Sequence, residues 1–316
     1  MRVLLFGAGG FLGRWVAREC AGCGDVVTAV VRRAGSGAPW AKREINVDLL
    51  SPVAAPDAGR QDAAVFLSQS PRYREHPGGS EEVVRVNLGG LVQALEMARR
   101  SGVDRFLYGS SGSVYGVGRE AFREEDPLLG TGVYAITKRC GEELAREWSR
   151  WFPVVSMRFF ALYGPGQRGR MVAEVVEAVR AGRAVPVQPR EFGELEPAGF
   201  ATSPCLVGDA ARAVRRLCEG DQEGPVNIAG PEAVTIREIA DCVGRRLGRS
   251  VKYEVGAKPR RGDLVARIDR LRDWTGIEPV RFEVGVETLI GSGSRERRGV
   301  VGTVDDVAGE GGTGQR

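Results

Sequence analysis

The sequence predicts an α/β protein built on a doubly wound parallel β-sheet, with a smaller C-terminal α/β domain. Short apolar runs alternate with longer amphipathic stretches from residue 2 to about residue 160. A glycine-rich turn follows the first apolar run, at the place where a strand would lead into a helix. The 316 residues are enough for about two domains of ordinary size.

The N-terminal half contains five candidate strands, each a short apolar run between turn residues. They are residues 2–6, 26–31, 63–67, 105–108 and 154–158. Three stretches between them have the apolar spacing of amphipathic helices, at 11–21, 81–100 and 133–151. Because strand, helix and strand recur in this order, we expect the strands to be parallel in one sheet.

The spacing changes after residues 164–166, where we expect a smaller domain to begin. Helices are predicted at 172–181, 208–218, 236–247 and 270–275, strands at 226–228 and 251–255, and an irregular stretch at 186–204. Thr235 and Glu238 predict a capping box before the third of these helices. We predict that residues 1–165 form the first domain, to which later segments near 205–230 also belong. Residues 166–290 form most of the second domain, and residues 291–316 form a disordered Gly-rich tail.

Composition disfavours several classes of partner. The 45 basic and 41 acidic residues are interspersed, so we expect no nucleic-acid partner. No apolar run reaches about 18 residues and the first is too short for a signal peptide, which predicts no membrane partner and a cytoplasmic location. One histidine, His76, and one CxxC pair, Cys20 and Cys23, predict no metal site.

The glycine-rich turn is a candidate phosphate-binding site. Gly7, Gly10 and Gly13 stand between the first strand and the first helix. Glycines let the backbone approach a pyrophosphate, whose charge is favoured by the helix N-terminus. We therefore assign the turn, with Phe11 and Leu12, to a dinucleotide; a strand-to-helix turn without a ligand is the alternative.

The end of the second strand bears on which dinucleotide binds. Sites for NAD usually present an acidic residue there, about 20 residues after the glycines. Here the strand ends in Arg32 and Arg33. Two guanidinium groups suit a 2′-phosphate, which favours NADP(H) as the cofactor and leaves NAD(H) possible. A solvated basic pair at the strand end is the alternative.

A tyrosine, a lysine and a serine form a candidate acid/base group. Tyr134 and Lys138 are four residues apart, which places them on one helix face, and Ser111 follows the fourth strand. An adjacent ammonium group is expected to lower the tyrosine pKa, and three units would correspond to roughly 4 kcal/mol. A serine hydroxyl could share the hydrogen bond to a substrate carbonyl or alcohol. Because only four residues are lysines, a chance pairing is improbable.

With these residues the chain resembles the extended short-chain dehydrogenase/reductase superfamily, and within it the NAD-dependent epimerase/dehydratase family. The resemblance covers about residues 1–290 and includes further segments at 47–49, 86–87, 110–116, 158–160, 163–166, 226–230 and 260–263. It implies a Rossmann-type sheet whose first domain binds NAD(P) and a second domain that binds mainly substrate. It also implies a homodimer formed through the helix at 81–100 and the helix that carries Tyr134.

The resemblance also implies roles for individual residues. Tyr134 would be the general acid/base, Lys138 its pKa partner and ribose anchor, and Ser111 the substrate hydrogen-bond donor. The remaining roles fall on Asp48 and Leu49 beside the adenine, Asn87 beneath the cofactor pocket and Arg260 at the pyrophosphate of a nucleotide sugar. A structural Asn near a helix N-terminus is the alternative for Asn87.

Three departures from the family pattern bear on the substrate. Ala161 stands where epimerases commonly carry Asn, residues 202–204 replace an Arg-Asp-Phe, and Gly112-Ser113 replaces the Asp-Glu of sugar dehydratases. Dehydration is therefore disfavoured. We expect an NADPH-dependent ketoreductase acting on a nucleotide-activated keto sugar. The alternatives are an NAD-dependent nucleotide-sugar 4-epimerase and, from another class, a non-catalytic NAD(P)-sensing protein.

Overall fold

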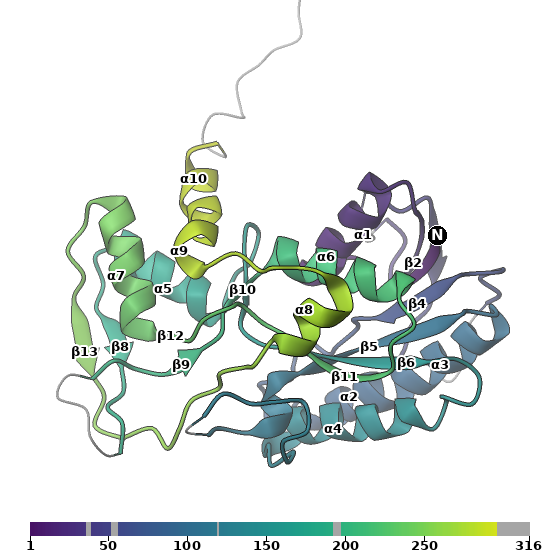
Figure 1. Ribbon diagram of the computed structural model, residues 1–316, viewed down its shortest axis with the longest axis horizontal. Coiled ribbons are helices and arrows are strands. Elements are labelled where there is room, and N and C mark those ends of the chain that lie inside the picture. Colours follow the sequence, from purple (N-terminus) through teal and green to yellow (C-terminus); the bar gives the residue numbers. More distant parts are fainter. Residues whose placement is uncertain (36–38, 52–55, 119, 192–196, 296–316) are drawn as a thin grey trace, which may run out of the picture.

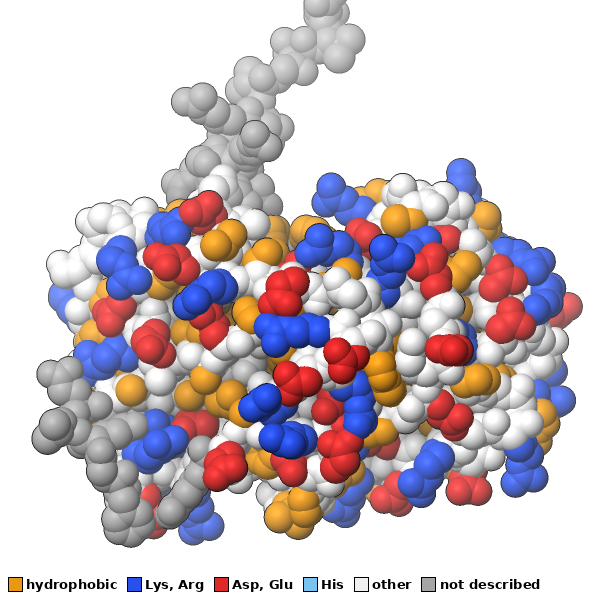
Figure 2. Space-filling model, in the orientation of Figure 1, with side chains coloured by type: hydrophobic (Ala, Val, Ile, Leu, Met, Phe, Trp, Pro, Cys, Tyr) orange, Lys and Arg blue, Asp and Glu red, His pale blue; other side chains and the backbone are white. Residues whose placement is uncertain are grey.

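The computed structural model describes residues 1–316 except 36–38, 52–55, 119, 192–196 and 296–316. A parallel sheet with helices on both faces makes up one side of the molecule, and smaller strands and helices make up the other (Figure 1). This arrangement confirms the predicted doubly wound α/β fold. Basic and acidic side chains are interspersed over the face shown in Figure 2.

The main sheet has the strand order β11-β6-β5-β4-β1-β2-β3, and every neighbouring pair is parallel. Its strands are β1 (Arg2–Phe6), β2 (Val26–Val31), β3 (Arg43–Asn46), β4 (Ala63–Phe66), β5 (Arg105–Ser111), β6 (Val154–Phe159) and β11 (Gly224–Ile228). The chain winds in opposite directions from β1, which leaves a crevice at the carboxyl ends of the strands. Strand β3 was not predicted because its four residues include only one apolar side chain, Ile45.

Helices cover both faces of this sheet (Figure 1). One face carries α1 (Phe11–Gly22), α6 (Val207–Glu219) and α8 (Asp269–Thr275), and the other carries α2 (Ser80–Val84), η1 (Arg85–Gly89), α3 (Gly90–Arg100) and α4 (Gly132–Arg146). Along β1, Val3 and Leu5 belong to the apolar core between the sheet and α1, α6 and α8. Leu4 and Phe6 belong to the core on the opposite face, which includes residues of α3 and α4. Burial on both faces explains the continuous apolar runs.

Two predicted helices differ from the observed ones. The stretch at 81–100 is interrupted by a π-helical turn, η1. The helix at 133–151 ends at Arg146, because the residues after it form hydrogen-bonded turns that lead directly into β6. Tyr134 and Lys138 still lie within the observed helix α4.

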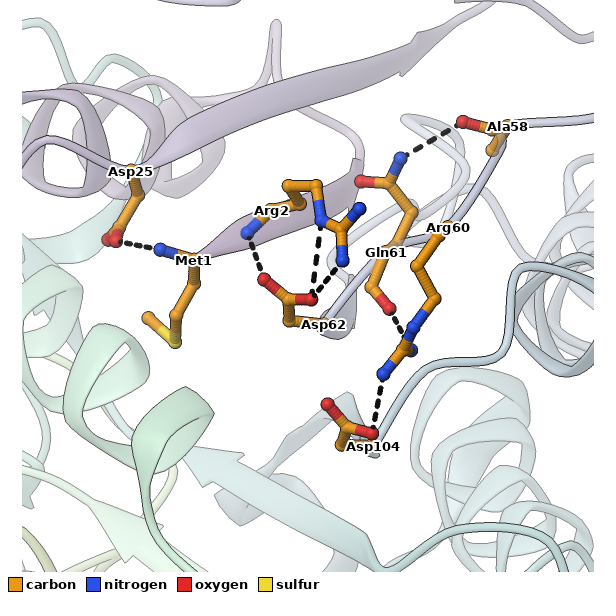
Figure 3. Close-up of polar contacts among 8 residues, drawn as sticks. All are labelled: Met1, Arg2, Asp25, Ala58, Arg60, Gln61, Asp62 and Asp104. Atoms are coloured by element: carbon orange, nitrogen blue, oxygen red, sulfur yellow. Dashed lines mark hydrogen bonds and ion pairs between the residues drawn. The ribbon is translucent and has the colours of Figure 1, made fainter.

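Ion pairs hold the amino ends of the strands (Figure 3). The amino group of Met1 donates to Asp25 at 2.8 Å, a hydrogen bond that raises the pKa of this amine. Asp25 also accepts from Arg215 of α6 at 2.8 Å. Arg2 contacts Asp62, just before β4, through its backbone N–H at 2.7 Å and its guanidinium at 2.9 Å. These contacts lie at the opposite end of the sheet from the crevice.

The second group of elements has its own core of apolar side chains, including Val175, Val179, Ile239, Val243 and Phe282. Its elements are α5 (Met171–Arg180), β8 (Val185–Val187), β9 (Ala201–Thr202), β12 (Val234–Thr235), α7 (Ile236–Leu247), β13 (Tyr253–Val255), α9 (Phe282–Gly285) and α10 (Glu287–Arg295). Strands β8 and β9 lie within or beside the stretch predicted as irregular. A short pairing of β7 (Leu162–Tyr163) with β10 (Cys205–Leu206) lies at the junction with the main sheet.

Helix α10 (Glu287–Arg295) includes the first residues of the tail that is predicted from residue 291. The helix continues to Arg295, and its residues Leu289 and Ile290 pack on the core of the second group of elements, which holds the helix in place. The rest of the predicted tail, 296–316, lies outside the described residues. Among the residues described, no helix is both long enough and apolar enough to cross a bilayer.

The predicted capping box at the start of α7 is confirmed. The N–H of Glu238 donates to Thr235 Oγ1 at 3.2 Å, and the N–H of Thr235 donates to Glu238 Oε2 at 2.8 Å. We expect Thr235→Ala to lower the free energy of unfolding by about 1 kcal/mol, because it leaves a helix N–H without its acceptor. Urea denaturation followed by circular dichroism measures this loss.

Thr131 provides a matched control. It occupies the N-cap position of α4, but its side chain makes no capping hydrogen bond. Thr131→Ala is therefore expected to change the free energy of unfolding by no more than a few tenths of a kcal/mol. Equal losses in the two variants would show that the capping box does not stabilise α7.

Candidate active site

A cavity of about 980 Å³ lies at the carboxyl ends of the strands, between the sheet and the second group of elements. Every predicted site residue except Asn87 and Arg260 lines it. Among the described residues, no group of three or more His, Cys, Asp or Glu side chains is arranged to hold a metal ion.

The glycine turn forms one wall of this cavity and has room for an anion. Gly7 has a φ of 83°, and its carbonyl oxygen accepts from the N–H of Gly10 at 3.0 Å. A Cβ on Gly13 would stand 2.1 Å from that oxygen. Helix α1 begins directly after this turn, and no side chain caps its first N–H groups. The turn therefore fits the diphosphate of a dinucleotide, as its spacing predicts.

Tyr134 and Ser111 meet at the centre of the cavity. Ser111 ends β5, and Tyr134 lies in the first turn of α4. Burial raises the pKa of Tyr134, and its hydrogen bond with Ser111 offsets this only in part. The expectation that the tyrosine pKa would be lowered is therefore wrong for this structure. The reason is that burial of the phenol outweighs its hydrogen bond with Ser111.

Lys138 is buried beneath the tyrosine. Its Nζ donates to the Gly109 carbonyl at 2.6 Å and lies 5.3 Å from the ring centre of Tyr108 and 5.9 Å from that of Tyr134. Burial lowers the pKa of Lys138 to about 8, although the carboxylate of Glu142 raises it. Burial of the charged lysine therefore lowers the free energy of unfolding below pH 8. This loss becomes smaller as the pH rises from about 8 towards the ordinary pKa of lysine.

A buried polar network continues from Glu142 below the site. Glu142 accepts from Ser110 and pairs with Arg158 at 2.7 Å. Arg158 also donates to the hydroxyl of Tyr115 at 2.7 Å, which donates to Asn227 on β11 at 2.8 Å. The role of Glu142 was not predicted from the sequence, although its spacing from Lys138 repeats the four-residue interval that relates Lys138 to Tyr134.

Two predicted residues lie outside the cavity. Asn87 is fully buried and donates to Thr137 of α4 at 3.1 Å, so it braces the helix that carries Tyr134. Arg260 is 7% exposed, pairs with Asp263 at 3.0 Å and donates to the Gln188 carbonyl at 3.0 Å. Its guanidinium is thus engaged within the protein, whereas the resemblance implied a contact with substrate.

Sequence reasoning also missed a group of cavity residues beside Tyr134. Tyr73, Arg74, Arg168 and Arg170 line the cavity, and the ring centre of Tyr73 lies 4.8 Å from that of Tyr134. They come from two loops that are far apart in the sequence. No local pattern could have shown that they meet.

Comparisons with known proteins agree with this geometry. A family model described as "NAD dependent epimerase/dehydratase family" matches residues 3–229. The chain is 30% identical over 185 residues to UDP-glucuronic acid decarboxylase 6 of Arabidopsis thaliana, which covers 55% of this chain and 52% of that protein. It is 28% identical to dTDP-4-dehydro-6-deoxy-D-allose reductase of a Streptomyces species, over 66% of each chain.

A solved structure extends the similarity over nearly the whole chain. MoeE5 in complex with UDP-glucose and NAD is 26% identical, with a TM-score of 0.80, over 94% of this chain and all of that one. By sequence, the chain spans about half the length of the first curated relatives it matches.

The buried pair Glu142–Arg158 generates a stability prediction. Removing one partner leaves the other charge buried, so Glu142→Leu and Arg158→Met are each expected to lower the free energy of unfolding by about 3 kcal/mol. The double variant should lose clearly less than the sum, because no charge is left unpaired. Chemical denaturation of all four proteins gives the coupling energy.

The exposed pair Glu96–Arg99 is the control. Its atoms are also 2.7 Å apart, but both side chains are about 40% exposed. The two single variants and the double variant of this exposed pair should give a coupling energy of at most about 1 kcal/mol. If the losses at Glu142 and Arg158 were additive, the buried pair would not stabilise the site.

Proposed function

The chain belongs to the NAD-dependent epimerase/dehydratase family, and on that premise we propose that it is an NADPH-dependent ketoreductase acting on a nucleotide-activated keto sugar. The meeting of Ser111, Tyr134 and Lys138 in one cavity carries the proposal. The phenol of Tyr134 can supply the proton that reduction of a ketone consumes, and burial, which raises its pKa, favours this protonated form. The similarity to a dTDP-keto-sugar reductase supports the same direction of reaction.

The side chains around the crevice have separate roles in the proposed reaction. A bound nicotinamide dinucleotide supplies the hydride. Ser111 holds the substrate carbonyl oxygen, and Tyr134 Oη donates its proton to that oxygen, so that the ketone becomes a secondary alcohol. The Lys138 ammonium group stabilises the phenolate that remains until the tyrosine regains a proton from solvent.

We assign the dinucleotide to residues 1–165 and most of the substrate to 166–290. The glycine turn would hold the diphosphate, with Asp48 and Leu49 beside the adenine. Arg32 and Arg33 follow β2, line the cavity and are exposed, which suits the 2′-phosphate of NADP(H).

An NAD-dependent nucleotide-sugar 4-epimerase is the second candidate. The structural relative MoeE5 was solved with NAD and UDP-glucose, which favours that reading. In this case a bound NAD would supply the hydride chemistry in both directions with no net use of the cofactor, while Tyr134 would take the proton of the alcohol and return it after the other face of the ketone is reduced. A non-catalytic NAD(P) sensor is disfavoured, because a sensor has no need of Ser111, Tyr134 and Lys138 together.

The function is tested by mixing the protein with NADPH and either dTDP- or UDP-4-keto-6-deoxyglucose. We expect one NADPH to be consumed for each alcohol formed. Tyr134→Phe should lower kcat by about 10²- to 10⁴-fold while NADPH still binds, because only the proton donor is removed. Tyr253→Phe is the control, since this tyrosine contacts Asp241 outside the cavity.

The bound nucleotide distinguishes the two candidates. After denaturation of freshly purified protein, chromatography should show no retained NAD, and the protein should prefer NADPH over NADH at least tenfold, about 1.4 kcal/mol. Tightly retained NAD without net NADPH consumption would establish the epimerase instead. Unchanged activity of Tyr134→Phe would exclude Tyr134 as the acid in either reaction.

We also propose a homodimer formed through the helices on one face of the sheet. Val84, Val92 and Ile136, on α2, α3 and α4, are each more than 40% exposed. The cytoplasmic location and the lack of a nucleic-acid partner stay predictions from the sequence.

Light scattering tests the dimer. The expected mass is twice the 34.0 kDa of the chain, and Val92→Glu should give a monomer by placing a charge in an apolar contact. Val284→Glu, at an exposed valine on α9, should leave the dimer intact. A monomeric parent protein would refute the proposal.

A further inference from the structure

Three arginines that line the cavity are called here the basic cluster: Arg74, Arg168 and Arg170. Tyr73 connects Arg74 and Arg170 to the catalytic group, because its ring lies 4.8 Å from that of Tyr134. The Cζ atoms of Arg170 and Arg74 lie 4.8 and 5.5 Å from the ring centre of Tyr73. Two guanidinium groups are thus separated from the proposed proton donor by one aromatic ring.

The charges of the basic cluster are not balanced by ion pairs within the described part of the chain. Arg74 donates to the Gly169 carbonyl at 3.3 Å, which orients it but adds no negative charge. The neighbouring Arg72, by contrast, pairs with Glu75 at 2.8 Å. Arg170 is partly buried, whereas Arg74 and Arg168 are exposed. An unpaired cation in a partly buried site is costly, which suggests that a ligand supplies the missing charge at Arg170.

Acidic groups near the cluster do not supply this charge. Glu82 lines the cavity and accepts from Ser70 at 2.7 Å. Glu174, on α5, raises the pKa of Arg170, but burial of the guanidinium has the larger effect and the pKa is lowered. Arg170 is therefore the member of the cluster that is placed least favourably when no anion is bound.

The position of Arg170 in the fold strengthens this point. It is the N-cap residue of α5, whose first N–H groups have no side-chain cap. A cation is disfavoured at the positive end of a helix dipole, where anions are stabilised. An oxyanion at this place would contact the guanidinium groups and the helix N-terminus together.

The other arginines among the described cavity residues lie at the part assigned to the dinucleotide: Arg14 on α1, and Arg32 and Arg33 after β2. The glycine turn lies at the start of α1 and is assigned to the dinucleotide as well. Arg260 is engaged with Asp263 and does not line the cavity. Thr202 lines the cavity in a segment, 202–204, that has no cationic side chain.

We propose that Arg74, Arg168 and Arg170 bind the diphosphate of the nucleotide-sugar substrate, with Tyr73 as the platform that orients Arg74 and Arg170. This assignment rests on the proposed function, because it takes the substrate to be a nucleotide sugar. The basic cluster therefore places the sugar between its own arginines and Ser111.

The test is calorimetric titration of UDP and of dTDP into protein already saturated with its nicotinamide dinucleotide, so that the glycine turn is occupied. Arg170→Ala is expected to weaken binding of the nucleoside diphosphates at least tenfold, and the exposed Arg168→Ala should weaken it to a smaller extent. Arg150→Ala is the matched control, because its guanidinium stacks 5.0 Å from Trp151 outside the cavity. Unfolding midpoints confirm that each variant is folded.

Unchanged affinity of Arg170→Ala for both UDP and dTDP would overturn the proposal. So would a variant that binds UDP normally but loses affinity for UDP-glucuronate relative to UDP-glucose, since the cluster would then bind a sugar carboxylate. The titration needs no turnover. A protein that binds UDP through Arg170 but reduces no keto sugar would therefore refute the ketoreductase and keep this site.

Discussion

Helix α4 lies so close to β5 that a Cβ on Gly141 would stand 2.2 Å from the Tyr108 hydroxyl oxygen, and the geometry of the site depends on this contact. It places Tyr134, Lys138 and Glu142, which follow one another at four-residue intervals, against the end of the strand that carries Ser111. Lys138 and Glu142 are buried there, and Tyr134 is partly buried at the cavity wall. Burial therefore raises the tyrosine pKa, lowers the lysine pKa and makes an arginine partner necessary for the glutamate.

Charge is distributed unevenly around this contact. Below the site Glu142 and Arg158 are paired, and the network from Glu142 through Arg158 to Asn227 joins α4 to β6 and β11. At the substrate end, the guanidinium groups beside Tyr73 lack such partners among the described residues. This contrast separates the part of the molecule that holds the acid in place from the part that is suited to an anionic ligand.

Local patterns predicted the parallel sheet, the glycine turn, the Tyr134–Lys138 pair and the capping box at Thr235, because each depends on residues close together in the sequence. Strand β3 was missed since its stability comes from pairing with β2 rather than from its own residues. The direction of the Tyr134 pKa shift depends on burial, which residue spacing does not encode. The meeting of Tyr73 with Arg170, almost a hundred residues apart, is a property of the tertiary structure alone.

Whether Tyr134 holds its proton at neutral pH is measured most directly by titrating tyrosinate absorbance in the nucleotide-free protein and in Tyr134→Phe. If the tyrosine is the protonated acid of a reductase, the two curves should coincide up to a pH of about 10, the ordinary tyrosine pKa, and separate only above it. A titrating component near neutral pH that is present in the parent and absent from Tyr134→Phe would contradict this. It would show that the phenolate is the resting form, as an enzyme that begins by oxidising an alcohol requires.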